Sequence, residues 1–96
     1  MKKKELNKMK PKIIRILRKH GVRKAGIFGS YVKGEQKKNS DIDILIDPPR
    51  NMSLIGFVHV KYKLEDELGI KIDLVSYKGI HPLLKNQILH EEVKII

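Results

Sequence analysis

Two short segments in which apolar residues recur with a period of two constrain the fold more than any other feature of the sequence, although Leu45 and Val75 place an apolar residue on the opposite face as well. Residues 41–47 read Asp-Ile-Asp-Ile-Leu-Ile-Asp, and residues 70–76 read Ile-Lys-Ile-Asp-Leu-Val-Ser. A period of two places successive side chains on opposite faces of a strand, so each segment predicts a strand with one apolar face. The opposite face then carries Asp41, Asp43 and, in the second strand, Asp73.

The chain before these strands predicts a basic amphipathic helix and a short buried strand. Apolar residues share one helical face over residues 10–20, and the stripe extends backwards to Leu6. Pro11 suits the first turn of this helix, and Gly21 marks its end. Residues 25–28 are apolar and predict a strand that leads into a turn.

The remaining patterns complete an alternating order of helices and strands. Ser53 is a good N-cap for a second helix, which Gly69 would end. Pro82 can open a last helix, and residues 93–96 predict either a short edge strand or a tail that docks on a partner. The order predicts a small mixed β-sheet with helices packed on one face, an α/β or α+β fold.

Size and composition limit the class of protein. With 96 residues, 41% of them apolar and 33% charged, we expect one domain over residues 1–96 and no fused lid or acceptor-binding domain. The absence of Cys excludes disulfides and thiolate zinc sites. The sequence has no apolar run long enough for a membrane span and no secretory signal, so we expect a cytoplasmic protein without membrane contact.

The positive charge is concentrated at one end of the chain. Residues 1–24 contain eleven of the 21 Lys and Arg residues and a single acidic residue, Glu5, so this segment carries the whole net charge of +10. Such a pole attracts nucleic acid, nucleotide phosphates or an acidic protein, and it is equally typical of a solvated helix face. The sign of the charge does not separate these possibilities.

The aspartates are the candidate chemistry of the chain. Asp41 and Asp43 share one strand face, roughly 6 to 7 Å apart along the backbone, a span that a hard cation can bridge. Taken alone, such a pair is more typical of a solvated strand face. If Asp73 lies on the adjacent strand with the same facing, three carboxylates converge, enough to hold two metal ions against a triphosphate. Upstream, Gly29 lets the backbone approach a phosphate closely, and Ser30 can donate its hydroxyl.

These residues resemble the signature of a known family. Residues 28–35 read Phe-Gly-Ser-Tyr-Val-Lys-Gly-Glu, and residues 40–46 read Ser-Asp-Ile-Asp-Ile-Leu-Ile. This arrangement is similar to that of the minimal nucleotidyltransferases (MNT proteins) of the DNA polymerase beta superfamily, and the resemblance covers nearly the whole chain. It implies the polymerase-beta-type nucleotidyltransferase fold. Lys33 departs from the pattern, because many relatives carry Arg there.

The resemblance implies a role for each candidate residue. Asp41 and Asp43 would ligate Mg²⁺, and Asp73 would be the third metal-binding carboxylate, so that all three are catalytic and hold two ions. Gly29 and Ser30 would bind the β- and γ-phosphates of the substrate ATP.

The resemblance also implies a partner. MNT proteins are often paired with a HEPN-domain protein and are then called MntA-type antitoxins. This implies transfer of AMP from ATP to a tyrosine of a HEPN ribonuclease toxin, by a homo-oligomer or a hetero-oligomer with the toxin. Three alternatives stay open: a non-catalytic antitoxin that acts by binding alone, a small-molecule nucleotidyltransferase, and a basic RNA-binding module. The chain has only five aromatic residues, which argues against direct nucleic-acid binding.

Overall fold

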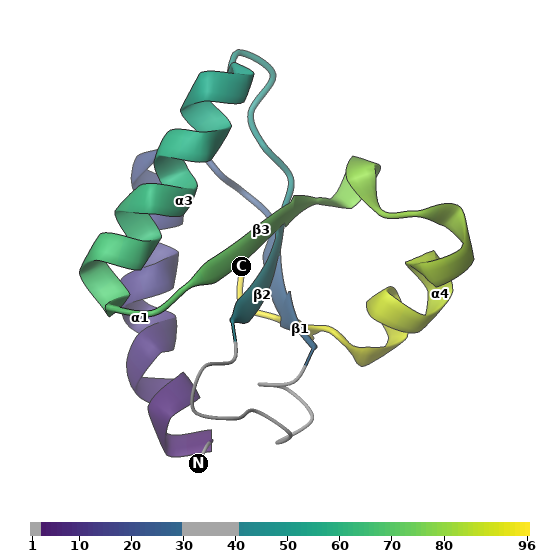
Figure 1. Ribbon diagram of the computed structural model, residues 1–96, viewed down its shortest axis with the longest axis horizontal. Helices are drawn as coiled ribbons and strands as arrows, with labels where there is room; N and C mark the ends of the chain where they lie inside the picture. The colour runs from purple at the N-terminus through teal and green to yellow at the C-terminus, as the bar shows by residue number, and fades with distance from the viewer. Residues whose placement is uncertain (1–2, 30–40) are drawn as a thin grey trace.

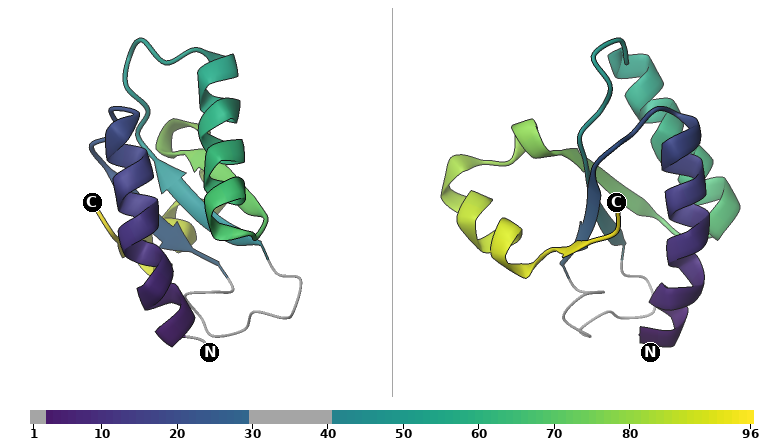
Figure 2. Two further views of the ribbon diagram at one scale, coloured as in Figure 1. Left: turned by 90° about the vertical axis from the view of Figure 1, so that its left-hand side faces the viewer. Right: turned by 180° about the vertical axis from the view of Figure 1, so that it is seen from behind.

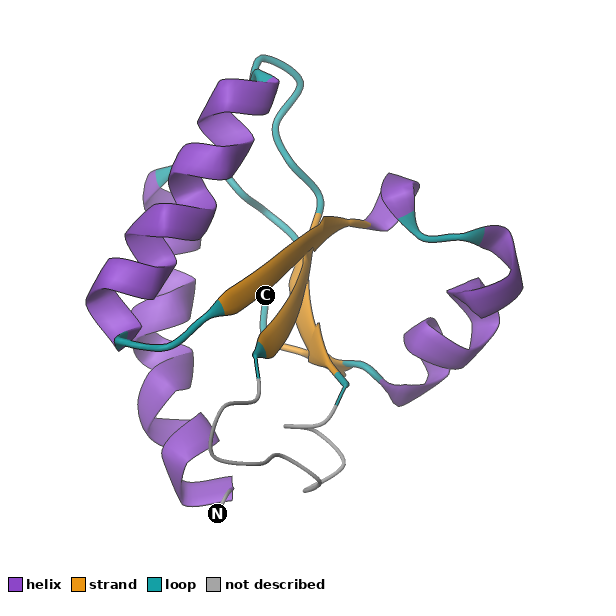
Figure 3. Cartoon of the chain, viewed as in Figure 1, coloured by secondary structure: helices purple, strands orange, loops and turns teal. Residues whose placement is uncertain are grey.

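The computed structural model describes residues 3–29 and 41–96, in which helices pack on a four-stranded mixed sheet (Figures 1 and 3). Along the chain the elements are α1 (Lys3–Lys19), β1 (Ala25–Phe28), β2 (Ile42–Ile46), α3 (Leu54–Leu68), β3 (Ile72–Ser76), the 3₁₀ turn η1 (Tyr77–Gly79), α4 (Pro82–Glu91) and β4 (Val93–Lys94). The strand order is β3-β2-β1-β4. The β2–β3 pair is parallel, and the other two pairs are antiparallel.

The helices lie on both sides of this sheet. Helices α1 and α3 lie side by side on one face, as predicted, whereas α4 lies on the other side (Figures 1 and 2). None of the residues of α4 is buried. The apolar residues of α4 form no marked stripe along one face of the helix, so the sequence could not indicate on which side of the sheet the helix packs. Within the described part of the chain, no helix combines the length and the apolarity needed to cross a membrane.

The ends of α3 are those that the sequence predicts. The Ser53 hydroxyl accepts a hydrogen bond from the backbone N–H of Gly56, at 3.0 Å. At the other end Gly69 adopts the left-handed conformation, with φ of 66°, and its N–H donates to the carbonyl of Glu65. Both ends of the helix thus have the partners that stop it from fraying.

The start of α1 was predicted wrongly. The helix begins at Lys3, so Pro11 lies in its interior and not in its first turn. An interior proline costs a helix about 3 kcal/mol, which must be offset by other contacts. Leu6 supplies such a contact, because it is only 7% exposed and belongs to the apolar core. Tertiary packing therefore carries this helix through Pro11, along the apolar stripe that reaches back to Leu6.

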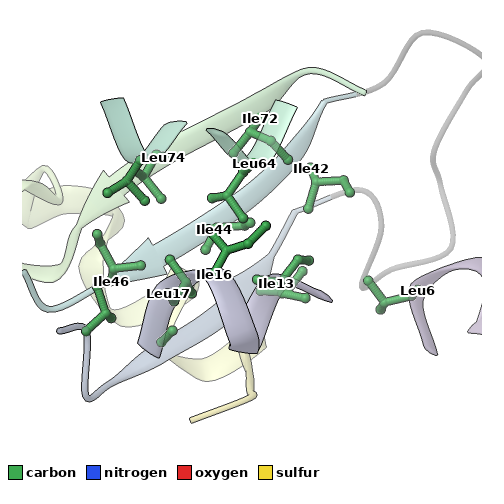
Figure 4. Close-up of a cluster of buried hydrophobic side chains, with 14 residues drawn as sticks. Leu6, Ile13, Ile16, Leu17, Ile42, Ile44, Ile46, Leu64, Ile72 and Leu74 are labelled. Atoms are coloured by element: carbon green, nitrogen blue, oxygen red, sulfur yellow. The ribbon is translucent and has the colours of Figure 1, made fainter. Parts of the chain in front are cut away.

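The core lies between the sheet and the α1–α3 layer (Figure 4). Buried side chains of five elements contribute to it, among them Ile13, Ile16 and Leu17 of α1, Ile27 of β1, Ile42, Ile44 and Ile46 of β2, Val60 and Leu64 of α3, and Ile72 and Leu74 of β3. The alternation of both strands is confirmed, since every second residue enters this core. At the edge, β4 pairs with β1, so the edge-strand alternative for the end of the chain is confirmed.

Substitutions of two leucines of α3, one buried and one exposed, test the importance of this core. Leu64 is fully buried, whereas Leu54 is 78% exposed on the same helix. Leu64→Ala should lower the free energy of unfolding by about 2–5 kcal/mol, because it removes apolar contacts and leaves a cavity. Leu54→Ala, the matched control, should change it by less than about 0.5 kcal/mol. Urea unfolding followed by circular dichroism measures both values, and equal losses would contradict the described packing.

Candidate active site

The pairing of β2 with β3 determines which acidic side chains meet. In this parallel ladder Asp43 is the register partner of Asp73. Register partners point to the same face, and this face is the one opposite the core because Ile42 and Ile44, on either side of Asp43, are buried in the core. Asp73 therefore lies on the strand next to Asp43 and faces the same side of the sheet, which is the condition for the two carboxylates to form one site.

The two carboxylates affect each other's ionisation. The pKa of Asp43 is raised to about 6, first because burial disfavours its charged form and then through the charge of Asp73 and a side-chain hydrogen bond to it. The charge of Asp41 adds a smaller effect in the same direction. The repulsion between two carboxylates held together in this way is reduced when one of them binds a proton or when a cation binds between them.

Asp41 does not complete a three-carboxylate group. It is exposed and precedes the first residue of β2, so the ladder that fixes Asp43 and Asp73 does not fix its side chain. Within residues 3–29 and 41–96, no three His, Asp or Glu side chains form a group that could hold a metal ion. The expected convergence of three aspartates is thus reduced to a pair in the part of the chain that the structure describes.

The chemistry of this pair nevertheless fits Mg²⁺. This ion prefers oxygen ligands, and proteins usually hold it with one or two carboxylates together with the phosphates of the substrate. Asp43 and Asp73 supply such oxygens side by side, and their mutual repulsion raises the proton affinity of one of them. A divalent cation placed between them would remove that repulsion. The role of the three aspartates as metal ligands stays a prediction.

Gly29 brings the backbone of the neighbouring strand against this pair. It follows β1, whose last residue, Phe28, is paired with Asp43. The φ angle of Gly29 is 82°, and a Cβ atom at this position would collide with the Oδ2 atom of Asp43. Only glycine satisfies both conditions. Ser30 lies outside the described residues, so its contact with a phosphate also stays a prediction.

A second cluster on the same side of the sheet was not anticipated from the sequence. The Tyr77 hydroxyl donates to Oε2 of Glu92 at 2.8 Å, and the Lys24 ammonium lies 4.5 Å from the centroid of the Tyr77 ring. Burial, followed by the hydrogen bond and charge of Glu92, raises the pKa of Tyr77. Gly26 is the available signal, because a Cβ atom there would collide with the carboxylate of Glu92. This cluster ties the end of α4 to β1.

The fold and the paired carboxylates beside a glycine turn agree with the family to which the sequence is matched. The family described as "Polymerase beta, Nucleotidyltransferase" matches residues 11–96. The chain belongs to this family, and it is therefore a nucleotidyltransferase.

Individual relatives agree with this assignment. A Methanocaldococcus jannaschii protein, assigned as a protein adenylyltransferase, is 52% identical over 95% of this chain and 98% of its own length. The protein adenylyltransferase MntA of Thermococcus cleftensis is 41% identical over 78% of this chain and 76% of its own length.

Solved structures share the fold. A structure assigned as a minimal nucleotidyltransferase has a TM-score of 0.84 and 30% identity, over 97% of this chain and 95% of that chain. A crystal structure of a toxin–antitoxin with AMP-PNP has a TM-score of 0.80 and 29% identity, over 91% of this chain and 72% of that one. The predicted polymerase-beta-type fold is thus confirmed.

Two glycines with positive φ test the close approach of β1 to the pair. Gly69, with φ of 66°, has open space where a Cβ would lie, whereas Gly29 meets Asp43 there. Both alanine substitutions should lower the free energy of unfolding by about 1–2 kcal/mol through backbone strain. Only Gly29→Ala should also abolish nucleotidyl transfer, because it displaces a carboxylate. Transfer at the wild-type rate by Gly29→Ala would contradict the described geometry.

The raised pKa of Asp43 predicts an unusual dependence of stability on pH. Because its folded pKa of about 6 lies above its unfolded value, the folded state binds more protons between these values. The free energy of unfolding should therefore fall as the pH rises from about 4 to about 6. Without metal, Asp43→Asn should be more stable than the wild type by about 1 kcal/mol at alkaline pH, a figure that allows for solvent screening. Urea unfolding with EDTA measures this, and a difference independent of pH would contradict it.

Proposed function

We propose that this protein, as a single minimal nucleotidyltransferase domain over residues 1–96, transfers AMP from ATP to a tyrosine hydroxyl of a HEPN ribonuclease toxin. It thereby acts in the cytoplasm as an antitoxin. The observation that carries the proposal is the pairing of Asp43 with Asp73 in register, with the backbone of Gly29 against them. Relatives named protein adenylyltransferase and a similar toxin–antitoxin crystallised with AMP-PNP support ATP as the donor and a protein as the acceptor.

The reaction requires that ATP and the acceptor tyrosine be positioned and that the charge of the phosphates be neutralised. It needs no nucleophile from this chain. The tyrosine oxygen of the acceptor forms a bond to the α-phosphorus of ATP and loses its proton. The bond from that phosphorus to the bridging oxygen breaks, and pyrophosphate leaves. The products are the AMP-modified tyrosine, pyrophosphate and the proton of the tyrosine hydroxyl, which is released to the solvent.

Each site residue contributes to one part of this step. Asp41, Asp43 and Asp73 would hold two Mg²⁺ ions, which supply charge neutralisation for the phosphates. Gly29 lets the phosphate chain approach the backbone, and Ser30 would donate its hydroxyl to the β- and γ-phosphates. The position of the aspartates at the start of β2 and β3, next to the end of β1, brings these contributions to one end of the sheet.

Aspartate-to-asparagine variants test these roles. Asp43→Asn and Asp73→Asn should each reduce AMP transfer by at least about 100-fold, because each removes a negatively charged ligand of the Mg²⁺ ions that would neutralise the reacting phosphates. Asp41→Asn tests whether the exposed third aspartate joins the pair when ATP is bound, and the same loss is expected. Intact-mass spectrometry of the HEPN partner, after incubation with ATP and Mg²⁺, counts the AMP units gained.

Asp66→Asn is the matched control, since Asp66 is an exposed carboxylate on α3, and it should transfer AMP at the wild-type rate. Undiminished transfer by Asp43→Asn would contradict the assignment of the site. A second experiment tests the proposed function itself. If an Asp43→Asn, Asp73→Asn double variant inhibits the toxin as fully as the wild type, the protein is an antitoxin that acts by binding alone.

A further inference from the structure

A basic pocket lies at the end of the sheet opposite the paired aspartates. It has a volume of about 530 Å³ and forms where β1 begins, β2 ends and η1 follows β3. The residues that shape it are Gly21, Arg23, Asp47, Pro49, Arg50 and Lys78. Asp47 is four residues along the chain from Asp43, which in extended chain corresponds to roughly 13 Å. The pocket is therefore separate from the candidate active site.

The pocket holds uncompensated positive charge. Arg23, Arg50 and Lys78 converge on it, and the only carboxylate among its described lining residues is that of Asp47. In the described part of the chain, the ion pairs within 4.0 Å are those of Glu67 with Arg15 and Lys63, so none involves these three cations. Three cationic side chains around one concavity attract an anion, and the single carboxylate of Asp47 offsets only part of their charge.

The walls between these side chains are firmly held. Gly21 has φ of 83°, and a Cβ added to it would lie 3.5 Å from Cγ of Pro49. The N–H of Asp47 donates to the carbonyl of Lys24 at 3.0 Å, and the N–H of Met52 donates to that of Pro49 at the same distance. A proline-rich, hydrogen-bonded rim loses little freedom when a ligand binds, so little of the binding free energy is lost to ordering the protein.

These features define the chemistry of the ligand. Guanidinium groups match the oxygens of phosphate with two parallel hydrogen bonds, and an ammonium adds a point charge. No aromatic side chain is among the described lining residues, so the pocket offers no aromatic surface on which a base could stack. Its volume is also larger than a single phosphate group requires.

We propose that Arg23, Arg50 and Lys78 form a second anion site, which binds linked phosphate groups, as free pyrophosphate or as the phosphate chain of a nucleotide. The site does not depend on the proposed transfer reaction, because it uses none of the residues assigned to that reaction. Asp47 weakens it, since its carboxylate lies in the same pocket as the bound phosphates.

A titration of the ¹⁵N-labelled full-length protein with pyrophosphate, followed by NMR in EDTA without divalent cations, tests the proposal. Saturable shifts are expected at the amides of Arg23, Arg50 and Lys78, whereas those of Gly29 and Asp43 should stay unchanged, because the unneutralised carboxylates repel phosphate. ATP in a second arm identifies the source: tighter binding of ATP indicates a nucleotide, and equal or weaker binding indicates free pyrophosphate. An absence of saturable shifts at the pocket with both ligands would overturn the proposal.

Substitutions in the pocket give the matched comparison. An Arg23→Gln, Arg50→Gln double variant should bind pyrophosphate at least about tenfold more weakly, because it loses two charged donors. Arg18→Gln, on the exposed side of α1, should bind as the wild type does. Asp47→Asn should bind more tightly, so a gain as well as a loss is expected. Unchanged binding by the double variant would refute the site.

Two other ligands separate the proposal from its alternatives. A hexaglutamate peptide should bind more weakly than pyrophosphate, and equal or tighter binding would assign the pocket to an acidic protein segment instead. Oligouridylate binding at the pocket without any response to pyrophosphate would assign it to a nucleic-acid strand. Either result would overturn the proposal.

Discussion

The parallel pairing of β2 with β3 is the constraint on which the rest of the structure depends. Parallel neighbours need a crossover connection, which α3 provides, and α3 in turn covers the apolar face of both strands. The ladder that places Ile44 beside Leu74 in the core places Asp43 beside Asp73 on the other face. A slip of one residue would expose the isoleucines and bury the aspartates. The core therefore fixes the register of the site.

The site works against the stability of the fold when nothing is bound to it. Burial and the neighbouring Asp73 hold the pKa of Asp43 at about 6, so the ionised pair that would receive a cation is disfavoured in the empty protein. A ligand that binds only the folded state stabilises it, and the stabilisation grows with the logarithm of the ligand concentration once the site is largely filled. The same repulsion therefore provides a driving force for binding a divalent cation together with the nucleotide phosphates. The fully buried isoleucines on the core face of β2 hold the strands in place against this repulsion.

Much of this arrangement could be predicted from local patterns, and the failures have physical causes. The two alternating segments predict their strands, and Ser53 and Gly69 mark a helix, because in each case the signal lies within a few residues. The start of α1 could not be found in this way, since the burial of Leu6 overrides the local effect of Pro11. The hydrogen bond of Tyr77 with Glu92 joins residues fifteen positions apart and depends on where α4 docks. The sequence states that Asp41 and Asp43 share a strand face, but only the ladder distinguishes the fixed Asp43 from the exposed Asp41.

The two ends of the sheet also differ in charge. The start of β2 and β3 presents carboxylates, whereas the opposite end presents Arg23, Arg50 and Lys78. The sequence located most of the positive charge in residues 1–24, but Arg50 and Lys78 reach the same pocket from distant parts of the chain. Separation of the charges by the length of the strands would allow one small sheet to present the proposed cation site and the proposed anion site at once.

The central claim, that Asp43 and Asp73 form one metal–nucleotide site with Gly29, is tested most directly by paramagnetic NMR. Mn²⁺ would replace Mg²⁺ in the presence of AMP-PNP, an ATP analogue. The amide signals of Gly29, Asp43 and Asp73 are expected to broaden first and together, and to broaden more strongly with the analogue than without it. Broadening centred on another acidic residue, such as Asp47 or Glu67, with sharp signals at Asp43 and Asp73, would contradict it.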